Sequence, residues 1–159
     1  MRDSIPDDQF RPIVLGNFLF KVSSKILADM LAQVAARIVS TQQFGFIRDW
    51  HIEDCIALAS DCVNVLHKKC YEGNVAMEIY ICKAFDTLDW KFLCRVLRAF
   101  GFPQTFMDWI VSILSSLRLF VLINGSPTGY FGCLRGVRLG DPLSSLLFGI
   151  AEDFLSRLL

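Results

Sequence analysis

The chain lacks any long run of apolar residues, although 53% of its 159 residues are hydrophobic. A membrane-spanning helix needs about 20 predominantly apolar residues, and charged side chains such as Lys21, Lys25 and Arg37 interrupt every candidate stretch. The first eight residues also lack the apolar core of a secretory signal peptide. The sequence therefore predicts an intracellular, non-secreted protein with no membrane partner.

Metal-binding and disulfide patterns are also missing. The six cysteines show no Cys-x-x-Cys spacing, and neither His51 nor His67 forms a pattern with them. Zinc sites and the disulfide frameworks of secreted proteins both depend on such spacings. We therefore expect free thiols in a reducing compartment and no zinc.

An excess of basic charge is absent as well, because 16 Lys and Arg residues balance 16 Asp and Glu residues. Nucleic-acid-binding proteins gain most of their non-specific affinity by neutralising phosphates with Lys and Arg. The balance therefore argues against tight nucleic-acid binding by this chain alone. The high apolar content excludes disorder and predicts exposed apolar surface, with self-association as a possible consequence.

The hydrophobic pattern predicts mostly helices in the first two thirds of the chain. A first helix, capped by Asn17, would carry an apolar stripe at fourfold spacing: Phe18, Val22, Ile26, Met30 and Val34. A second, over about 51–69 and closed by Gly73, would have one apolar face: Ile52, Ile56, Ala59, Val63 and Leu66. Residues 76–81 read as a short strand. Two further helices are marked by Trp90, Leu93, Val96 and Leu97, and by Phe106, Ile110, Ile113 and Leu114.

The last third predicts a hairpin and a final helix. Asn124-Gly125 is a strong hairpin signal because both residues tolerate positive φ, and it lies between the apolar runs 118–123 and 128–131. Asp141-Pro142 would open a helix with these residues facing inward: Leu143, Leu146, Leu147, Ile150 and Phe154. Helices, one isolated strand, a hairpin and a helix give an α+β fold class.

Two segments carry most of the functional information. Residues 76–90 read Ala-Met-Glu-Ile-Tyr-Ile-Cys-Lys-Ala-Phe-Asp-Thr-Leu-Asp-Trp, and residues 135–148 read Arg-Gly-Val-Arg-Leu-Gly-Asp-Pro-Leu-Ser-Ser-Leu-Leu-Phe. Together they resemble the palm of reverse transcriptases of the LINE type (non-LTR retrotransposons), closest to the plant kind. The resemblance runs from about Phe10 to Leu159 and includes three more motifs: Arg11-Pro-Ile followed by Lys21 and Lys25, Gln43-Phe-Gly-Phe, and the hairpin 123–129.

The resemblance implies part of a right-hand polymerase, with fingers in residues 1–75 and an incomplete palm in residues 76–159. It implies an RNA template and a DNA primer as partners, and Mg²⁺ as the metal of the family. By the resemblance, the residues that bind the nucleotide would be Arg11, Lys21, Phe85, Gly136 and Gly140. Contacts to nucleic acid would come from Lys25, Arg135 and Arg138.

Taken one at a time, these residues have simpler interpretations. Phe85 would be an ordinary core residue, the basic side chains would be surface charges, and the glycines would lie in turns. Asp86 would cap the helix that starts near Trp90, and Asp141 would cap the final helix. Only their joint order and spacing indicate the polymerase.

The sequence departs from the family at its most important position. Where the family strand has a metal-binding Asp, in a pattern such as Leu-Asp-Met-Ser-Lys-Ala-Tyr-Asp, this chain has Tyr80. A phenol has a pKa near 10 and is neutral at pH 7, so it is a poor ligand for a hard cation. Leu139 and Cys82 replace residues that are typically Gln and Ser.

The chain also ends at Leu159, before the second carboxylate motif of the family could appear. These features predict a degenerate, inactive fragment with no intact catalytic residue, no bound metal and no cofactor. Three alternatives stay open: an active polymerase, a retained nucleic-acid-binding module, and a protein-interaction module that uses exposed apolar faces.

Overall fold

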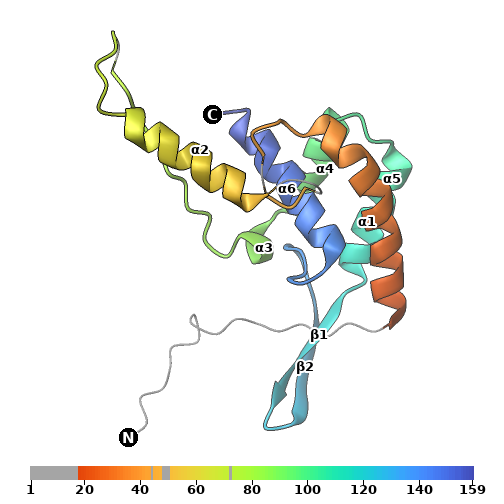
Figure 1. Ribbon diagram of the computed structural model, residues 1–159. Helices are drawn as coiled ribbons and strands as arrows, with labels where there is room; N and C mark the ends of the chain where they lie inside the picture. Colours follow the sequence, from red (N-terminus) through yellow and green to blue (C-terminus); the bar gives the residue numbers. More distant parts are fainter. Residues whose placement is uncertain (1–17, 44, 48–50, 72) are drawn as a thin grey trace, which may run out of the picture.

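The computed structural model describes residues 18–43, 45–47, 51–71 and 73–159. Its elements, in chain order, are α1 (Phe18–Ile38), α2 (Ile52–Val65), α3 (Ala84–Thr87), α4 (Trp90–Ala99), α5 (Gln104–Ser115), β1 (Arg118–Ile123), β2 (Ser126–Gly132) and α6 (Pro142–Ser156). Figure 1 shows α1, α4, α5 and α6 gathered in one body, with the hairpin β1–β2 projecting from it and α2 standing apart. The described residues are mostly helical and include one antiparallel hairpin, which agrees with the predicted helices and hairpin.

Helix α6 is the centre of the core. Leu147 and Ile150 are fully buried, as are Val96 and Leu97 from α4 and Ile110 from α5. A helix that is apolar on most of its circumference must be covered on several sides, which explains why α1 and α4 both pack on α6. The predicted inward-facing residues of this helix are confirmed, with Phe154 only partly buried.

The predicted apolar stripe of α1 is wrong. Phe18 and Ile26 are 77% and 56% exposed, whereas the buried residues of α1 are Ser24, Leu27, Ala28, Leu31 and Ala35. A row at strict fourfold spacing turns by about 40° per step around a helix of 3.6 residues per turn, so it does not stay on one face. The true face follows spacings of three and four and includes small side chains. The proposed cap Asn17 lies outside the described residues.

The helices α4 and α5 form as predicted, but the residue that caps α4 is different. Asp89 is the N-cap, and its carboxylate accepts the backbone N–H of Phe92 at 2.7 Å. Asp86, the predicted cap, lies instead in the single-turn helix α3. Side-chain capping needs an acceptor directly before the first helical residue, and Asp89 has that position relative to Trp90.

The hairpin forms where Asn124-Gly125 predicts it. Both residues have positive φ, 51° and 81°, and Ile123 pairs with Ser126 across the two-residue loop. The register shifts between Leu119 and Val121 of β1. Gly129 has a φ of 69° opposite that shift, which is the geometry of a bulge that begins with a left-handed glycine.

The predicted strand 76–81 is absent. These residues adopt no regular structure, their side chains are exposed, and among the described strands β1 and β2 pair only with each other. An extended segment becomes a strand only when a neighbouring strand satisfies its backbone groups. Apolar alternation in the sequence cannot supply that neighbour.

Candidate functional site

Tyr80 lies on the extended segment that joins α2 to α3. Its side chain is 86% exposed, and those of Met77 and Ile79 are 78% and 52% exposed. The segment therefore presents its side chains to solvent instead of holding them against the body.

Phe85 sits in an aromatic cluster on the side of the core. Its ring stacks on Phe148 of α6 at a centroid distance of 5.0 Å and meets the edge of Phe46 at 5.8 Å. Phe46 also contacts Phe148 edge to face. The cluster holds α3 against α6, which is the packing role expected for an aromatic at this position. Sequence reasoning missed Phe46 and Phe148, because ring contacts between distant segments leave no local signal.

The loop 133–141 is anchored to the segment 85–90 by short hydrogen bonds. The N–H of Gly136 donates to the Leu88 carbonyl at 2.7 Å, and that of Val137 to the Phe85 carbonyl at 2.6 Å. The Trp90 indole N–H donates to the Gly136 carbonyl at 2.7 Å. A Cβ at Gly136 would lie 2.6 Å from the Asp86 carbonyl oxygen. The two motifs that carry the resemblance are therefore in direct backbone contact.

Asp141 ends this loop, and its carboxylate does not cap α6 as predicted. It occupies the N-cap position without a side-chain bond to the helix backbone. Instead, both of its oxygens lie 2.6 Å from the Ser24 hydroxyl of α1, and one also accepts from the Ser144 hydroxyl. This contact ties α1 to the start of α6. Ser24 is fully buried, and its hydroxyl satisfies the requirement that buried polar groups be hydrogen-bonded.

The predicted basic residues have different surroundings. Lys25 forms an exposed ion pair with Asp29 at 2.7 Å, and Lys21 is exposed on the first turns of α1. Arg135 is exposed on the loop, whereas Arg138 is half-buried, with its guanidinium 5.0 Å from the centre of the Phe20 ring. Arg11 lies outside the described residues. The structure thus half-buries Arg138, whereas Lys25 lines a different, open cleft with its side chain 60% exposed.

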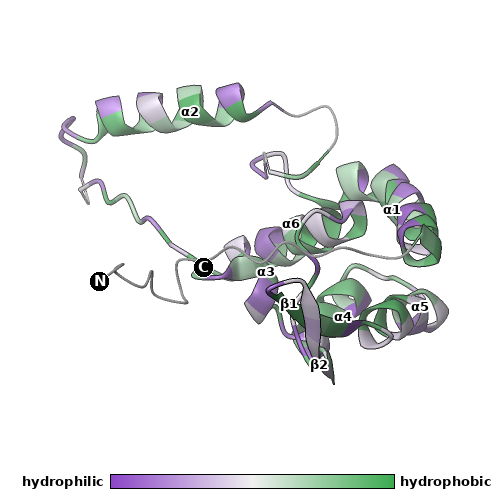
Figure 2. Ribbon diagram, turned by 90° about the horizontal axis from the view of Figure 1, so that it is seen from below, coloured by the Kyte–Doolittle hydropathy of each residue, from purple (hydrophilic) through white to green (hydrophobic). Residues whose placement is uncertain are grey.

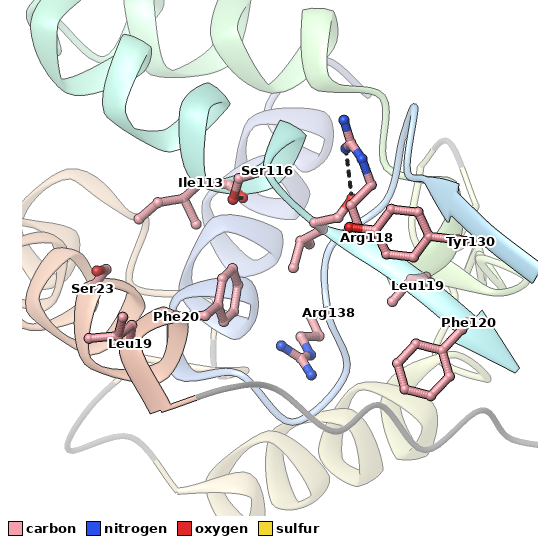
Figure 3. A pocket seen from close by; sticks show the side chains of 11 residues that line it. Leu19, Phe20, Ser23, Ile113, Ser116, Arg118, Leu119, Phe120, Tyr130 and Arg138 are labelled. Atoms are coloured by element: carbon pink, nitrogen blue, oxygen red, sulfur yellow. Dashed lines mark hydrogen bonds between the residues drawn. The ribbon is translucent and has the colours of Figure 1, made fainter. Parts of the chain in front are cut away.

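A cleft of about 480 Å³ opens between the start of α1, the end of α5 and the hairpin. Figure 3 shows Phe20 and Arg138 beside each other, with Phe120 and Tyr130 of the hairpin across the cavity. Arg118 also lines it and donates to the carbonyls of Ser115 and Leu117 at the end of α5. Aromatic rings, hydroxyls and a guanidinium suit a ligand that has both flat apolar and anionic parts.

Gly140, the other predicted glycine, has a φ of 84°, and a Cβ added to it would meet no heavy atom within 4 Å. It is a turn glycine with free space around it. A smaller cavity of about 110 Å³ lies between the loop and Asp86, and Arg135 and Leu139 are part of its lining.

Two observations concern reactive thiols and metal ligands in the described part of the chain. Burial raises the pKa of the Cys94 thiol, since desolvation outweighs the opposing effect of Arg98, and a raised pKa lowers the fraction of reactive thiolate. No three His, Cys, Asp or Glu side chains are grouped to hold a metal ion within the described ranges. None of the helices described there has the length and apolarity that a membrane crossing requires.

Comparison with known proteins agrees with the resemblance of the two motifs. The family model described as "Reverse transcriptase (RNA-dependent DNA polymerase)" matches residues 5–159. The Pol polyprotein of the type-2 retrotransposable element R2DM of Drosophila melanogaster is 31% identical over 157 residues, which are 97% of this chain and 14% of that protein. The transposon TX1 149 kDa protein of Xenopus laevis is 29% identical over 94% of this chain and 11% of its own length.

A Pol polyprotein from an R2 element of Popillia japonica is 29% identical over 92% of this chain and 20% of its own length. The chain therefore spans between about a tenth and a fifth of the curated relatives that it matches over most of its length. Because the family model matches nearly the whole chain, the protein belongs to the reverse transcriptase (RNA-dependent DNA polymerase) family.

Proposed function

We propose that this chain is a degenerate part of the reverse transcriptase domain of a LINE-type element, closest to the plant kind, and that it has no polymerase activity. Residues 1–75 would correspond to the fingers and residues 76–159 to the first part of the palm. The feature that supports the proposal is Tyr80: by the resemblance it stands at the position of the family's metal-binding Asp, and its phenol is exposed to solvent.

The residues present do not fit the Mg²⁺ of the family. Two-metal phosphoryl transfer needs carboxylates that hold two cations about 4 Å apart, and a neutral phenol offers one weak oxygen. Glu78 is two residues away, about 6.6 Å along an extended chain, and its side chain is exposed. The Asp141 carboxylate already accepts from Ser24 and Ser144. Neither of these two carboxylates is therefore both free and close enough to replace the missing one.

We expect the purified 159-residue chain to incorporate no nucleotide into a primer on an RNA template with Mg²⁺ or Mn²⁺. Tyr80→Asp alone should not restore incorporation, because it supplies one of several required carboxylates and these 159 residues contain no Ala-Asp-Asp sequence. Metal-dependent incorporation by the unmodified chain, measured by primer extension, would contradict the proposal.

A chimera separates the effect of Tyr80 from that of the remaining polymerase. The chain would be joined to the following palm and thumb of a related active element, with Tyr80, Tyr80→Asp or Tyr80→Asn. We expect only the Asp version to extend the primer, by at least about a thousandfold over the others, which corresponds to about 4 kcal/mol of transition-state free energy. The Asn version is the matched control, since it has the shape of Asp without its charge. Leu139→Gln in the active chimera tests whether the apolar side chain limits the rate.

A second candidate function is retained nucleic-acid binding, which the cleft beside Arg138 favours. Its aromatic side chains, Phe20, Phe120 and Tyr130, could stack on bases, and its guanidinium could bind a phosphate. Lys21 and Arg135 are exposed and could add phosphate contacts, whereas the ion pair with Asp29 competes for Lys25. Protein interaction through apolar faces is the alternative that the next experiment distinguishes.

We expect the chain to bind a fluorescent single-stranded RNA with an affinity that falls steeply with salt, measured by anisotropy. Arg138→Ala should reduce the slope of log K against log salt by about 0.7, the effect of losing one phosphate contact on a single strand. Arg95→Ala is the control, because Arg95 is an exposed arginine on α4, away from the cleft lining. Equal slopes for both variants would argue against a phosphate contact by Arg138.

A further inference from the structure

Helix α2 leaves an apolar face uncovered. No residue of this helix is buried, and Ile52, Ile56 and Val63 expose 69%, 62% and 62% of their surface. Figure 2 shows α2 separated from the body formed by α1, α4, α5 and α6. A row of large apolar side chains in water is a marker of an interaction surface.

The spacing of that row indicates what kind of surface it fits. Its members are separated by four, three, four and three residues: Ile52, Ile56, Ala59, Val63 and Leu66. These spacings keep the row on one face of α2, as in a helix that packs along another helix, and the exposed side chains of Leu58 and Val65 extend the apolar surface beside it. Ala59 is the central and smallest member, so a partner helix can approach closely there.

The charges of α2 indicate the direction of the partner helix. Glu53 and Asp54 lie in the first turn, Asp61 lies in the second half of the helix, and Lys68 and Lys69 follow the last turn. A parallel copy would place like charges and like helix ends together, which is unfavourable. An antiparallel copy places the acidic end of each helix against the basic end of the other. A second copy of this chain therefore supplies both the apolar seam and the complementary charges.

We propose that α2 is a self-association surface, which packs antiparallel against α2 of a second copy with the two Ala59 residues at the centre. Ile52 of one copy then lies opposite Leu66 of the other, and the interface has the twofold symmetry of most homodimers. The proposal does not depend on the absence of polymerase activity or on nucleic-acid binding.

Two cysteines on the flank of the seam give this geometry a direct test. Cys55 and Cys62 each precede a seam residue, Ile56 and Val63, and lie on the same side of the helix. In the antiparallel pair, Cys55 of one copy faces Cys62 of the other, at nearly the same height. The two Cys62 residues of the pair are then about 9 Å apart along the helix axis, and the two Cys55 residues about 12 Å apart, at 1.5 Å per residue.

The cross-linking experiment uses the full chain, with Cys70 and Cys82 changed to Ser and Cys94 and Cys133 changed to Ala. One version also carries Cys62→Ser and the other Cys55→Ser, so each keeps one cysteine. We expect a short bis-maleimide to cross-link a mixture of the two at least about fivefold faster than either version alone, because only unlike cysteines are adjacent. Equal rates in the mixture and in the separate samples would overturn the antiparallel geometry.

A charge on the seam tests the surface itself. Ile56→Asp should lower the cross-linked fraction at least about tenfold, since it would bury a carboxylate in the interface, and should leave only monomer in sedimentation. Leu58→Asp is the matched control, because Leu58 is 49% exposed on α2 but off the seam. Neither residue is buried, so both variants should keep the helical circular dichroism of the parent. A parent chain that is monomeric at all concentrations, or that is insensitive to Ile56→Asp, would overturn the proposal.

Discussion

Replacing Gly136 by alanine is expected to lower the free energy of unfolding by about 3 to 4 kcal/mol. The residue has a φ of 81°, which costs a side chain about 1 kcal/mol. The larger contribution is steric, because the new Cβ would lie 2.6 Å from the carbonyl oxygen of Asp86. A backbone atom cannot rotate away, so the loop must move.

Movement of the loop would weaken three hydrogen bonds at once. The bonds from Gly136 N–H to Leu88, from Val137 N–H to Phe85 and from the Trp90 indole to Gly136 are all 2.6 to 2.7 Å long. We therefore expect the indole N–H resonance of Trp90 to shift in the variant, in addition to the loss of stability in urea unfolding.

Gly140→Ala is the matched control for this prediction. Its φ of 84° is nearly the same, but no heavy atom lies within 4 Å of the added Cβ. We expect a loss of only about 1 kcal/mol, the cost of the left-handed backbone alone. If the two variants were equally stable, the close approach between the loop and Asp86 would not be the cause.

The parts of the fold that the sequence predicts correctly have local causes. Asn124-Gly125 fixes the hairpin through backbone conformations that these two residues tolerate, and Pro142 marks the first turn of α6. The apolar spacing in α4 and α5 is set by the residues of those helices alone. In each case the information lies within a few residues of the feature.

The parts that could not be predicted depend on distant segments. The strand expected at 76–81 needs a neighbouring strand, and the described residues provide none for it. The buried face of α1 is the one whose small side chains, such as Ser24 and Ala28, meet α6. In the sequence, the regular row of larger residues that begins with Phe18 and Val22 is the more prominent pattern, so it predicts the wrong face of α1.

The candidate site shows the same division. The motif order around residues 80 and 136 identifies the family, because several fixed residues fall in short windows. The contact of Gly136 with Asp86 and the stacking of Phe85 on Phe148 join segments that are 50 or more residues apart. Such contacts have no local pattern, so the packing role of Gly136 could not be expected from its neighbours in the chain. The roles of Arg11, Lys21, Phe85 and Gly140 toward a nucleotide stay predictions.

Replacing the buried Asp153 by alanine should cost about 3 kcal/mol of unfolding free energy. Its side chain on α6 is fully buried, and one oxygen accepts the backbone N–H of Ser40 at 2.9 Å, just beyond the end of α1. The other oxygen lies 2.8 Å from the guanidinium of Arg157, which also donates to the Ile38 carbonyl. The carboxylate thus joins the end of α1 to the end of α6.

Two variants separate the contributions of this group. Asp153→Asn keeps an oxygen for the Ser40 N–H but loses the charge that faces Arg157, so we expect an intermediate loss of about 1 to 2 kcal/mol. Asp29→Ala breaks an ion pair of similar length whose side chains are both 60% exposed, and it should cost less than about 0.5 kcal/mol. Urea unfolding measures the stability of all three variants, and hydrogen exchange at Ser40 should accelerate most in Asp153→Ala.

Because Arg157 is 45% exposed, water can solvate its charge when Asp153 is removed, so the unpaired Ser40 N–H should account for much of the loss of stability. An Asp153→Ala chain as stable as the Asp29→Ala chain would show that the Asp153 carboxylate does not help to hold the two helix ends together.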